Sequence, residues 1–526
     1  MSPTEPSPIE AGLAEPIHTP QVPRKRRRSQ GERTPQARRI SGPVRRAIAQ
    51  YDLLDEEALT AIETQADWIL QEIGVEFHGD TTALALFRTA GADVTGPRVR
   101  FHPGLARHLC ATAPASFALH GRDPAQNIIL GGDHVALMPG YGSPFVTDLD
   151  QGRRYATLED FRNFVRLSFL SPWLHHSGGT VCEPVDIPVN KRHLDMVHAH
   201  LTLSTKPFMG GVTSAQRAQD SIEMARIVHG QSFMEHHAAI QANINVNSPL
   251  VYDDTMSGVL RTYAAANQCV AVSPAIFGGA MGPLSPASVA AQTLAEAMVG
   301  IALAQLVRPG CPCVFGSFHS TMNLRSGALT FGSPEASLTT FALAQLGRRL
   351  GVPVRSGGGQ ITAANCADGQ AMQESSSAMW ATLLSGANQV WHAAGWLEGG
   401  LTMSYEKFVM DLDHCGAMLR MLQGFSTDAE AMGRDAYLET GPGQNFLSTA
   451  HTQRHFRDAN YLTEIPEPGP YETWVENGSP TLEQRANARW KSMLAAYEQP
   501  PMEDPIREAL DAFVARRKSE MNDEWY

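Results

Sequence analysis

Residues 389–411 read Gln389-Val-Trp-His-Ala-Ala-Gly-Trp-Leu-Glu-Gly-Gly-Leu-Thr-Met-Ser-Tyr-Glu-Lys-Phe-Val-Met-Asp411. The pattern predicts a short strand over 389–393 and a helix over 408–421. Glycines, carboxylates and aromatic rings lie between them, a mixture that a strand-to-helix turn does not need. Glycine lets the backbone approach a bulky group closely, and ring faces and carboxylates both attract cations. The stretch therefore predicts a functional loop, although simple packing of Trp396 and Tyr405 on a barrel rim is the alternative.

The same alternation of strand and helix occurs eight times along the chain. The predicted strands are residues 135–138, 176–181, 206–212, 239–245, 269–274, 313–317, 354–357 and 389–393. Helical segments are predicted at residues 158–170, 191–203, 215–228, 254–266, 288–306, 334–350 and 370–384. This order predicts an α/β fold, a closed parallel (β/α)₈ TIM-type barrel. An open doubly wound sheet is the alternative, but no convincing Gly-rich phosphate fingerprint follows the first strand.

Four segments are predicted. Residues 1–48 form a basic tail, 49–116 a helical N-terminal extension, 117–425 the barrel, and 426–526 a C-terminal helical segment packing on it. The tail is rich in Pro, Ser and Gln, so residues up to about Ser41 should be disordered and dispensable. Its polybasic run could address a nucleus or a phosphate surface, but a solvated tail is the preferred interpretation.

Charge and cysteine content limit the possible partners. The net charge is −12 although ten Lys and Arg residues lie between Arg24 and Arg46, so the rest is strongly acidic and should not bind nucleic acid. Seven scattered cysteines favour a reducing, cytoplasmic compartment over a disulfide framework. No uncharged apolar run of about 18 residues is found, which predicts no membrane span. The predicted barrel mouth has no HExxH motif or clean metal-ligand spacing, so no metal site is predicted.

Several motifs carry a resemblance to a known family. They are Gly332-Ser-Pro-Glu335, Asp368-Gly-Gln-Ala371 with Glu374, Leu383-Leu-Ser-Gly-Ala-Asn388, His392-Ala-Ala-Gly-Trp-Leu-Glu-Gly-Gly-Leu-Thr402 and Ser404-Tyr-Glu-Lys-Phe408. In this order they resemble the corrinoid-dependent trimethylamine methyltransferase family, from about residue 50 to about 515. The resemblance implies a TIM-type barrel that passes a methyl group from a methylated amine to the cobalt of a separate corrinoid protein, with no tightly bound cofactor of its own.

One position departs from the family pattern. Archaeal trimethylamine enzymes carry pyrrolysine after the seventh strand, and alignment through Asp368-Gly-Gln-Ala371 places Ile361 there. The electrophilic imine is therefore absent. A quaternary amine is already cationic and leaves as a neutral tertiary amine, so it needs no imine. In this respect the chain resembles glycine betaine methyltransferases.

The resemblance and the strand ends together suggest site residues. Trp396, Tyr405, Phe277 and Tyr141 are candidates for an ammonium cage, and Glu398 and Glu374 could supply negative charge. His392, His319, Gln360 and Arg355 are candidates for holding a substrate carboxylate, with a satisfied core histidine as the alternative for His319. Glu398 and His392 are the catalytic candidates. The glycines predicted to face the corrinoid are Gly357, Gly358, Gly359, Gly399 and Gly400.

Other functions stay open at this point. The amine could be trimethylamine or another methylamine, or the chain could bind betaines without turnover. A barrel lyase of the porphyrinogen decarboxylase type would also have an acidic, Gly-rich mouth, but it should carry a basic cluster for its anionic substrate. The chain is also predicted to form a homo-oligomer.

Overall fold

The computed structural model describes residues 44–457 and 459–525. The tail predicted over residues 1–48, with its dispensable part up to Ser41, therefore lies outside the described residues except at its end. That end is paired: β1 (Val44–Arg45) runs antiparallel to β7 (His134–Leu137). The Ala47 amide also donates to the Leu422 carbonyl at 2.7 Å. Residues 44–48 thus contact the main body.

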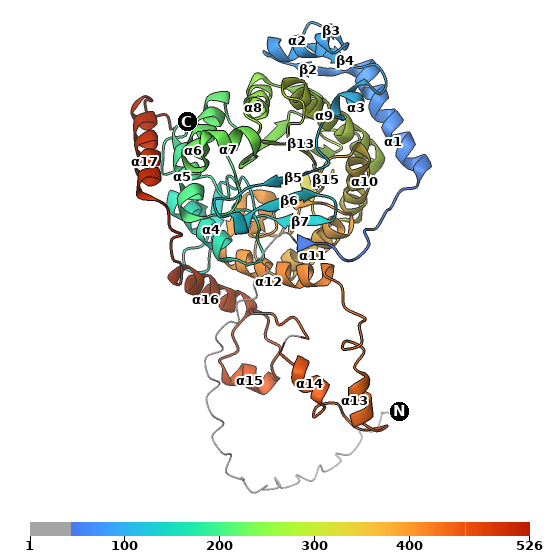
Figure 1. The fold of residues 1–526 in the computed structure, drawn as a ribbon, viewed down its shortest axis with the longest axis vertical. Helices are drawn as coiled ribbons and strands as arrows, with labels where there is room; N and C mark the ends of the chain where they lie inside the picture. The colour runs from blue at the N-terminus through green and yellow to red at the C-terminus, as the bar shows by residue number, and fades with distance from the viewer. Residues whose placement is uncertain (1–43, 458, 526) are drawn as a thin grey trace, which may run out of the picture. The chain divides into compact units, whose positions relative to one another are not determined.

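Short parallel strands form the core of the described chain (Figure 1). The largest sheet includes, in order, β10 (Phe208–Met209), β11 (Ile240–Val246), β13 (Cys269–Gly278), β14 (Cys313–Gly316) and β17 (Val354–Arg355). Every neighbouring pair in this order is parallel. Most of these residues are buried, as expected for parallel strands covered on both faces. The five strands lie at five of the predicted positions.

Of the other three predicted strands, two form and one does not. β7 lies at the first, and β18 (Gln389–Val390), at the last, pairs with β7 in parallel. The prediction of a strand over residues 176–181 is wrong, because the backbone turns at Gly178 with φ of +98°. That segment still bonds on both sides: His175 donates its amide to the Leu137 carbonyl, and Met209 donates to the Gly178 carbonyl, both at 2.8 Å.

Helices lie between the strands at the predicted positions, with ends within three residues of those expected. They are α4 (Leu158–Leu170), α5 (Arg192–Leu203), α6 (Ala215–His229), α8 (Asp254–Ala265), α9 (Pro286–Val307), α10 (Pro334–Leu350), α11 (Gly369–Leu384) and α12 (Tyr405–Leu422). All but α5 begin after a Ser, Thr or Asp whose side chain accepts an amide hydrogen bond from the first turn. In Figure 1, α8 to α12 follow one another around the strands.

α9 is a core helix of unusual apolarity. Among the described residues, it alone is long and apolar enough to cross a membrane, but 89% of its most apolar window is buried within the fold. Glu296 interrupts its apolar sequence. This carboxylate accepts hydrogen bonds from the Ser248 hydroxyl at 2.5 Å and the Leu250 amide at 2.9 Å. The burial explains why so apolar a helix occurs here.

The N-terminal extension contains helices and short strands. It contains α1 (Glu56–Trp68), the π-helix η1 (Ile69–Ile73), α2 (Thr81–Thr89), α3 (Leu105–Cys110), β2 (Val75–Phe77), β3 (Asp93–Thr95) and β4 (Arg98–Arg100). Asp55 caps α1, accepting from the Ala58 amide at 2.9 Å. β12 (Val251–Tyr252), which is distant in sequence, pairs with β2. Long-range pairing of this kind leaves no local sequence signal.

Additional elements lie at the two ends of the parallel strands. The hairpin of β5 (Ser116–Leu119) and β6 (Ile128–Gly131), with the 3₁₀ turn η2 (Pro124–Gln126), shares an apolar cluster with Ala238, Cys269 and Val314 near the strand starts. After the strands come β8 (Phe145–Thr147), β9 (Arg154–Tyr155), β15 (Phe318–Asn323), β16 (Ala328–Thr330), β19 (Trp396–Leu397), the 3₁₀ turn η3 (Glu398–Gly400) and β20 (Thr402–Ser404). α7 (Gln231–His236) precedes β11. Most of the candidate site residues come from the second group or from the loops beside it.

The C-terminal segment is rich in short helices. It contains α13 (Arg434–Glu439), α14 (Ala450–His455), α15 (Tyr471–Glu476), α16 (Leu482–Ala495) and α17 (Asp504–Ser519). α16 packs against α12 and α4, and α17 packs against α5 and α6. These two helices therefore contact the outer helices of the main body.

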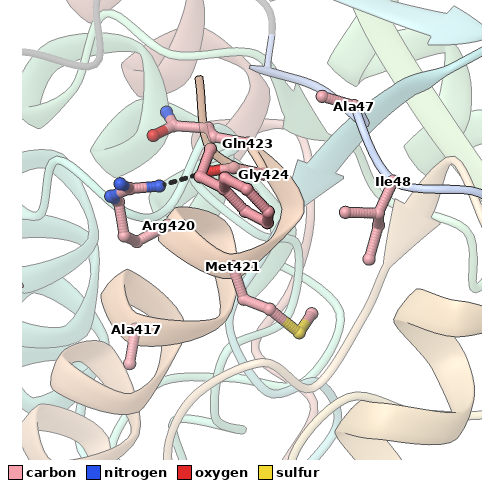
Figure 2. Close-up of a pocket in the computed structure, with 8 residues that line it drawn as sticks. Ala47, Ile48, Ala417, Arg420, Met421, Gln423 and Gly424 are labelled. Carbon is pink, nitrogen blue, oxygen red and sulfur yellow. Dashed lines mark hydrogen bonds between the residues drawn. The ribbon is translucent and has the colours of Figure 1, made fainter. Parts of the chain in front are cut away.

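A surface hollow separates the carboxyl end of α12 from the N-terminal segment (Figure 2). Ala47 and Ile48 lie on one side, and the last turn of α12 and Phe425 lie on the other. The Arg420 guanidinium donates to the Gly424 carbonyl at 2.7 Å and closes that turn. No predicted site residue lines the hollow, so it is separate from the candidate site.

Candidate active site

Three aromatic rings meet beyond the carboxyl ends of β14, β17 and β18. The ring centroids of Phe318 lie 6.1 Å from Phe331 and 5.9 Å from Trp396, and the latter two are 6.3 Å apart at 80°. Ile361 belongs to the same apolar cluster and is 4% exposed. Ring faces held in this way attract a cation. We call Phe318, Phe331 and Trp396 the aromatic cluster.

Local backbone geometry fixes Trp396 in this cluster. Trp396 lies on β19 opposite Met403 of β20. Gly400 has φ of +99°, and a Cβ there would lie 2.4 Å from Cζ2 of the Trp396 ring. Gly400 is therefore required both by its conformation and by the closeness of the indole.

His392 connects the cluster to a buried arginine. Its ring centroid lies 4.0 Å from that of Trp396, and its Nε2 lies 3.4 Å from Arg355 Nη2. A guanidinium only donates, so Nε2 accepts and Nδ1 carries the proton. Nδ1 has no partner among the described residues. Burial, with Arg355 contributing, holds the pKa of His392 well below its usual value, so the ring is neutral.

Arg355 is a buried cation with no carboxylate within ion-pair distance in the described chain. It is 2% exposed, lies 4.4 Å from the Trp391 ring and 5.6 Å from the Phe318 ring, and donates to the Ser317 carbonyl. Its Nε has no partner among the described residues. Burial lowers the pKa of Arg355 to about 9, so the guanidinium remains charged at neutral pH. An unpaired buried cation favours an anionic ligand.

A buried ion pair supports the backbone on both sides of the site. Lys407 Nζ lies 2.7 Å from Asp411 Oδ2, and both side chains are fully buried. Lys407 also donates to the Gln360 carbonyl at 3.2 Å, while Asp411 accepts from the Gly395 amide at 2.9 Å. Burial raises the pKa of Asp411 to about 6. The pair thus connects the residues next to Ile361 and Trp396.

Sequence comparisons agree on one family. The family model described as trimethylamine methyltransferase (MTTB) matches residues 23–522. The chain belongs to the trimethylamine methyltransferase family. It is therefore a methyltransferase.

The curated relatives include methyltransferases named for trimethylamine, for glycine betaine and for L-carnitine. The glycine betaine methyltransferase of Desulfitobacterium hafniense is 39% identical over 91% of this chain and 99% of its own. The L-carnitine:corrinoid methyltransferase of Eubacterium limosum is 27% identical over 82% and 90%. The crystal structure of the Methanosarcina barkeri monomethylamine methyltransferase has a TM-score of 0.46 at 12% identity, over 86% of this chain and 96% of that one.

The structure brings only part of the predicted site together. Trp396, His392, Arg355 and Ile361 lie in or beside the aromatic cluster, and Phe277 contacts Phe318 edge-on at 6.0 Å. Tyr141 lies 6.1 Å from Trp391, on which Arg355 also stacks. Burial raises the pKa of the Tyr141 hydroxyl, which interacts with Thr180 and Asn243.

Three other predicted residues point elsewhere. Tyr405 stacks between Phe164 and Trp490 and donates to Asp160 at 2.9 Å. His319 Nε2 contacts the Ala336 carbonyl and the Thr340 hydroxyl of α10, at 3.1 and 3.0 Å, whereas its buried Nδ1 has no partner among the described residues. The Gln360 amide donates to the Ala393 and Asp411 carbonyls. These three side chains bind to neighbouring helices and backbone carbonyls and therefore stabilise the fold.

Both predicted carboxylates already have partners. Arg153 donates to both oxygens of Glu398, at 3.1 and 3.0 Å. Glu374 accepts from the Thr362 hydroxyl at 2.6 Å and the Ala363 amide at 2.8 Å. Glu374 therefore fixes the loop that follows Ile361.

The predicted corrinoid-facing glycines are of two kinds. Gly357, Gly358 and Gly359 are buried, and a Cβ on Gly358 would meet the Ile361 side chain at 2.7 Å. Gly399 and Gly400 are partly exposed. The first group gives Ile361 its space, and the second lies beside the aromatic cluster.

Proposed function

We propose that this methyltransferase moves a methyl group from a quaternary amine that carries a carboxylate, of the glycine betaine type, to the Co(I) of a corrinoid on a separate protein. The observation that carries the proposal is the buried, unpaired Arg355 beside the aromatic cluster. Together they offer one place for a positive group and one for a negative group. The names of the betaine-using relatives support the same substrate class.

The aromatic cluster suits the trimethylammonium group. Its methyl groups spread the positive charge and cannot donate strong hydrogen bonds, so ring faces bind them well. His392 stays neutral beside the cluster and adds no repulsion. Arg355 would take the carboxylate through the guanidinium nitrogens that have few partners. Because Phe318 contacts both parts of the site, a short spacing between ammonium and carboxylate fits best.

Ile361 supports a quaternary donor over trimethylamine. Its side chain has no electrophile and packs within the aromatic cluster. If trimethylamine donated a methyl group without activation, the leaving group would be an amide anion. A betaine leaves as a neutral tertiary amine, so neither an imine nor a general acid is needed.

The reaction then depends on placement. The corrinoid of the partner supplies the nucleophile, and the methyl carbon is attacked on the side opposite nitrogen. The methyl group moves to cobalt, the carbon–nitrogen bond breaks, and its electron pair stays on nitrogen, giving dimethylglycine from glycine betaine. Charge is dispersed in this step, so a dry site helps, and orientation supplies much of the remainder.

We further propose that the parallel strands close into the predicted (β/α)₈ barrel. Hydrogen bonds from Asn388 to Val354, and from residues 175–178 to the strands on each side, support closure. The proposal also places the enzyme in a reducing cytoplasm, supported by seven free thiols. Absence of a resident cofactor and assembly into a homo-oligomer remain predictions.

A substrate screen tests the function. Purified chain mixed with Co(I) corrinoid should methylate cobalt with glycine betaine, read by absorbance, and release one dimethylglycine per methyl. Trimethylamine and dimethylamine should give essentially no reaction. A quaternary nitrogen does not titrate, so the donor adds no pH dependence of its own. The rate should hold between the pKa of Asp411, about 6, and that of Arg355, about 9, and should fall on either side. Binding of betaine without methyl transfer would instead indicate a binding protein, and robust trimethylamine turnover would refute the assignment.

The Trp396→Ala variant tests the cage. Loss of one desolvated ring face should weaken glycine betaine binding by about 1–2 kcal/mol, measured by calorimetry without corrinoid. Trp490→Ala is the matched control, because Trp490 stacks on Tyr405 outside the cluster. Equal affinity in Trp396→Ala and the native chain would mean that the indole only packs.

A further inference from the structure

A second cluster of ligand-type side chains lies in the C-terminal segment, outside the proposed active site. Glu430, His451 and His455 each offer a ligand atom, and these atoms all lie within 4.8 Å of one another. His455 Nε2 is 2.9 Å from Glu430 Oε1, and His451 Nε2 is 3.1 Å from the Glu430 carbonyl oxygen. Tetrahedral zinc holds its ligands at about 2.0–2.1 Å, which separates them by roughly 3.3–3.5 Å. In this cluster His455 Nε2 and Glu430 Oε1 are 2.9 Å apart and no pair of ligand atoms is more than 4.8 Å apart, so these distances bracket the separation expected in a zinc site.

The two histidines are arranged for chelation. They occupy positions i and i+4 of α14 and therefore project from the same side of the helix, with ring centroids 4.6 Å apart. Gly433, with φ of +59°, lets the preceding turn approach His451, and a Cβ there would lie 3.4 Å from its Nε2. Imidazole and carboxylate are ligands that zinc prefers.

The surrounding charges favour a cation. Glu430 and Asp435 both pair with Arg454, at 2.8 and 2.7 Å, and Asp428 lies close enough to His455 to interact electrostatically. Two carboxylates thus pair with Arg454, and a third, that of Asp428, lies near His455. Arg454 and His455 both contact Glu430 through Oε1, so the second carboxylate oxygen, Oε2, is left for a ligand.

The segment around this cluster has little else to hold it in place. α13, α14 and α15 have six residues each, too few to be stable alone. Large apolar side chains near them are exposed rather than packed: Phe425 is 87% exposed, Leu438 90% and Leu447 77%. Small units with so little buried surface commonly use a structural metal.

We propose that Glu430, His451 and His455 bind one divalent transition-metal ion, Zn²⁺ by preference, which ties residues 428–433 to α14. A water molecule would complete the tetrahedron. The role is structural, because the ion replaces the missing apolar core as the link between two short pieces of chain. This proposal does not depend on the methyl-transfer assignment.

Metal titration tests the site directly. Full-length, untagged protein is stripped with chelator and titrated with Zn²⁺ by calorimetry and with Co²⁺ by visible absorption. One equivalent should bind, and His451→Ala or His455→Ala should each weaken binding at least about 100-fold, since even supporting residues cost 10–100-fold. Zn²⁺ should also slow proteolysis within residues 428–455 in the native chain but not in these variants.

Two matched variants guard against adventitious binding. Cys366→Ser removes an exposed thiol, and His108→Ala removes an exposed histidine outside this cluster. Both should keep the one-equivalent site. Failure of the native chain to bind one equivalent, or unchanged binding in the His451→Ala and His455→Ala proteins, would overturn the proposal.

Discussion

Replacing Arg355 by methionine should lower kcat/KM for glycine betaine roughly 30-fold to several thousand-fold, which corresponds to a loss of about 2–5 kcal/mol in transition-state stabilisation. This is the range for removing one partner of a buried charged pair. The reason is geometric: Arg355 is 2% exposed and has no carboxylate partner among the described residues, so a substrate carboxylate would be the group that pairs with it. Steady-state methylation of Co(I) corrinoid measures the effect.

The stability of the same variant should move in the opposite direction. In the free enzyme Arg355 pays the desolvation penalty without an ion pair, and methionine of similar length removes it. The Tm of Arg355→Met should therefore equal or exceed that of the native chain. A binding role predicts lost activity together with retained stability, whereas a packing role predicts that both fall.

Two comparisons identify what Arg355 recognises. Arg355→Lys keeps a charge but loses the planar fork, so it should lie between the native chain and Arg355→Met. Quaternary amines without a carboxylate, such as choline or tetramethylammonium, should react equally slowly with all three proteins. An equal fractional loss for donors with and without a carboxylate would show that Arg355 acts by positioning the aromatic cluster.

Local sequence patterns predicted most of the scaffold. Helix ends were predictable because apolar periodicity and capping residues such as Thr157 and Ser333 act over a few residues. Strand positions were predictable because buried parallel strands are short apolar runs between helices. Residues 176–181 fit that description but turn at Gly178. β12 was missed because its partner β2 is far away in the sequence.

The candidate site was harder to predict, because a sequence gives positions but not side-chain directions. Tyr405 follows the glycine-rich loop, yet as the first residue of α12 its ring lies between Phe164 and Trp490. Phe318 and Phe331 were missed because both lie between predicted strand 313–317 and predicted helix 334–350, where no element was predicted, whereas residues 318–323 form β15 of a hairpin. An aromatic residue directly after predicted strand 313–317 was the signal available for Phe318.

The largest effect on stability should come from the buried pair beneath the site. Lys407→Met should lower the free energy of unfolding by about 3–5 kcal/mol, because it leaves Asp411 buried without its cation. The loss would include the hydrogen bond from Lys407 to the Gln360 carbonyl. Urea denaturation followed by circular dichroism measures the change. Arg516→Met is the matched control: Arg516 and Glu520 have the same i, i+4 spacing but are 57% and 41% exposed, so the change should stay below about 1 kcal/mol.

A double variant separates stability from function at this pair. Lys407→Met with Asp411→Leu removes both charges, so it should recover much of the stability lost in Lys407→Met. Its methyl transfer should stay low, because the Asp411→Leu change removes the acceptor of the Gly395 amide, which holds the start of the Trp396 segment. Full activity in a stable double variant would mean that the ion pair only stabilises the fold. Low activity with restored stability would show that the pair positions the aromatic cluster through the backbone on either side of it.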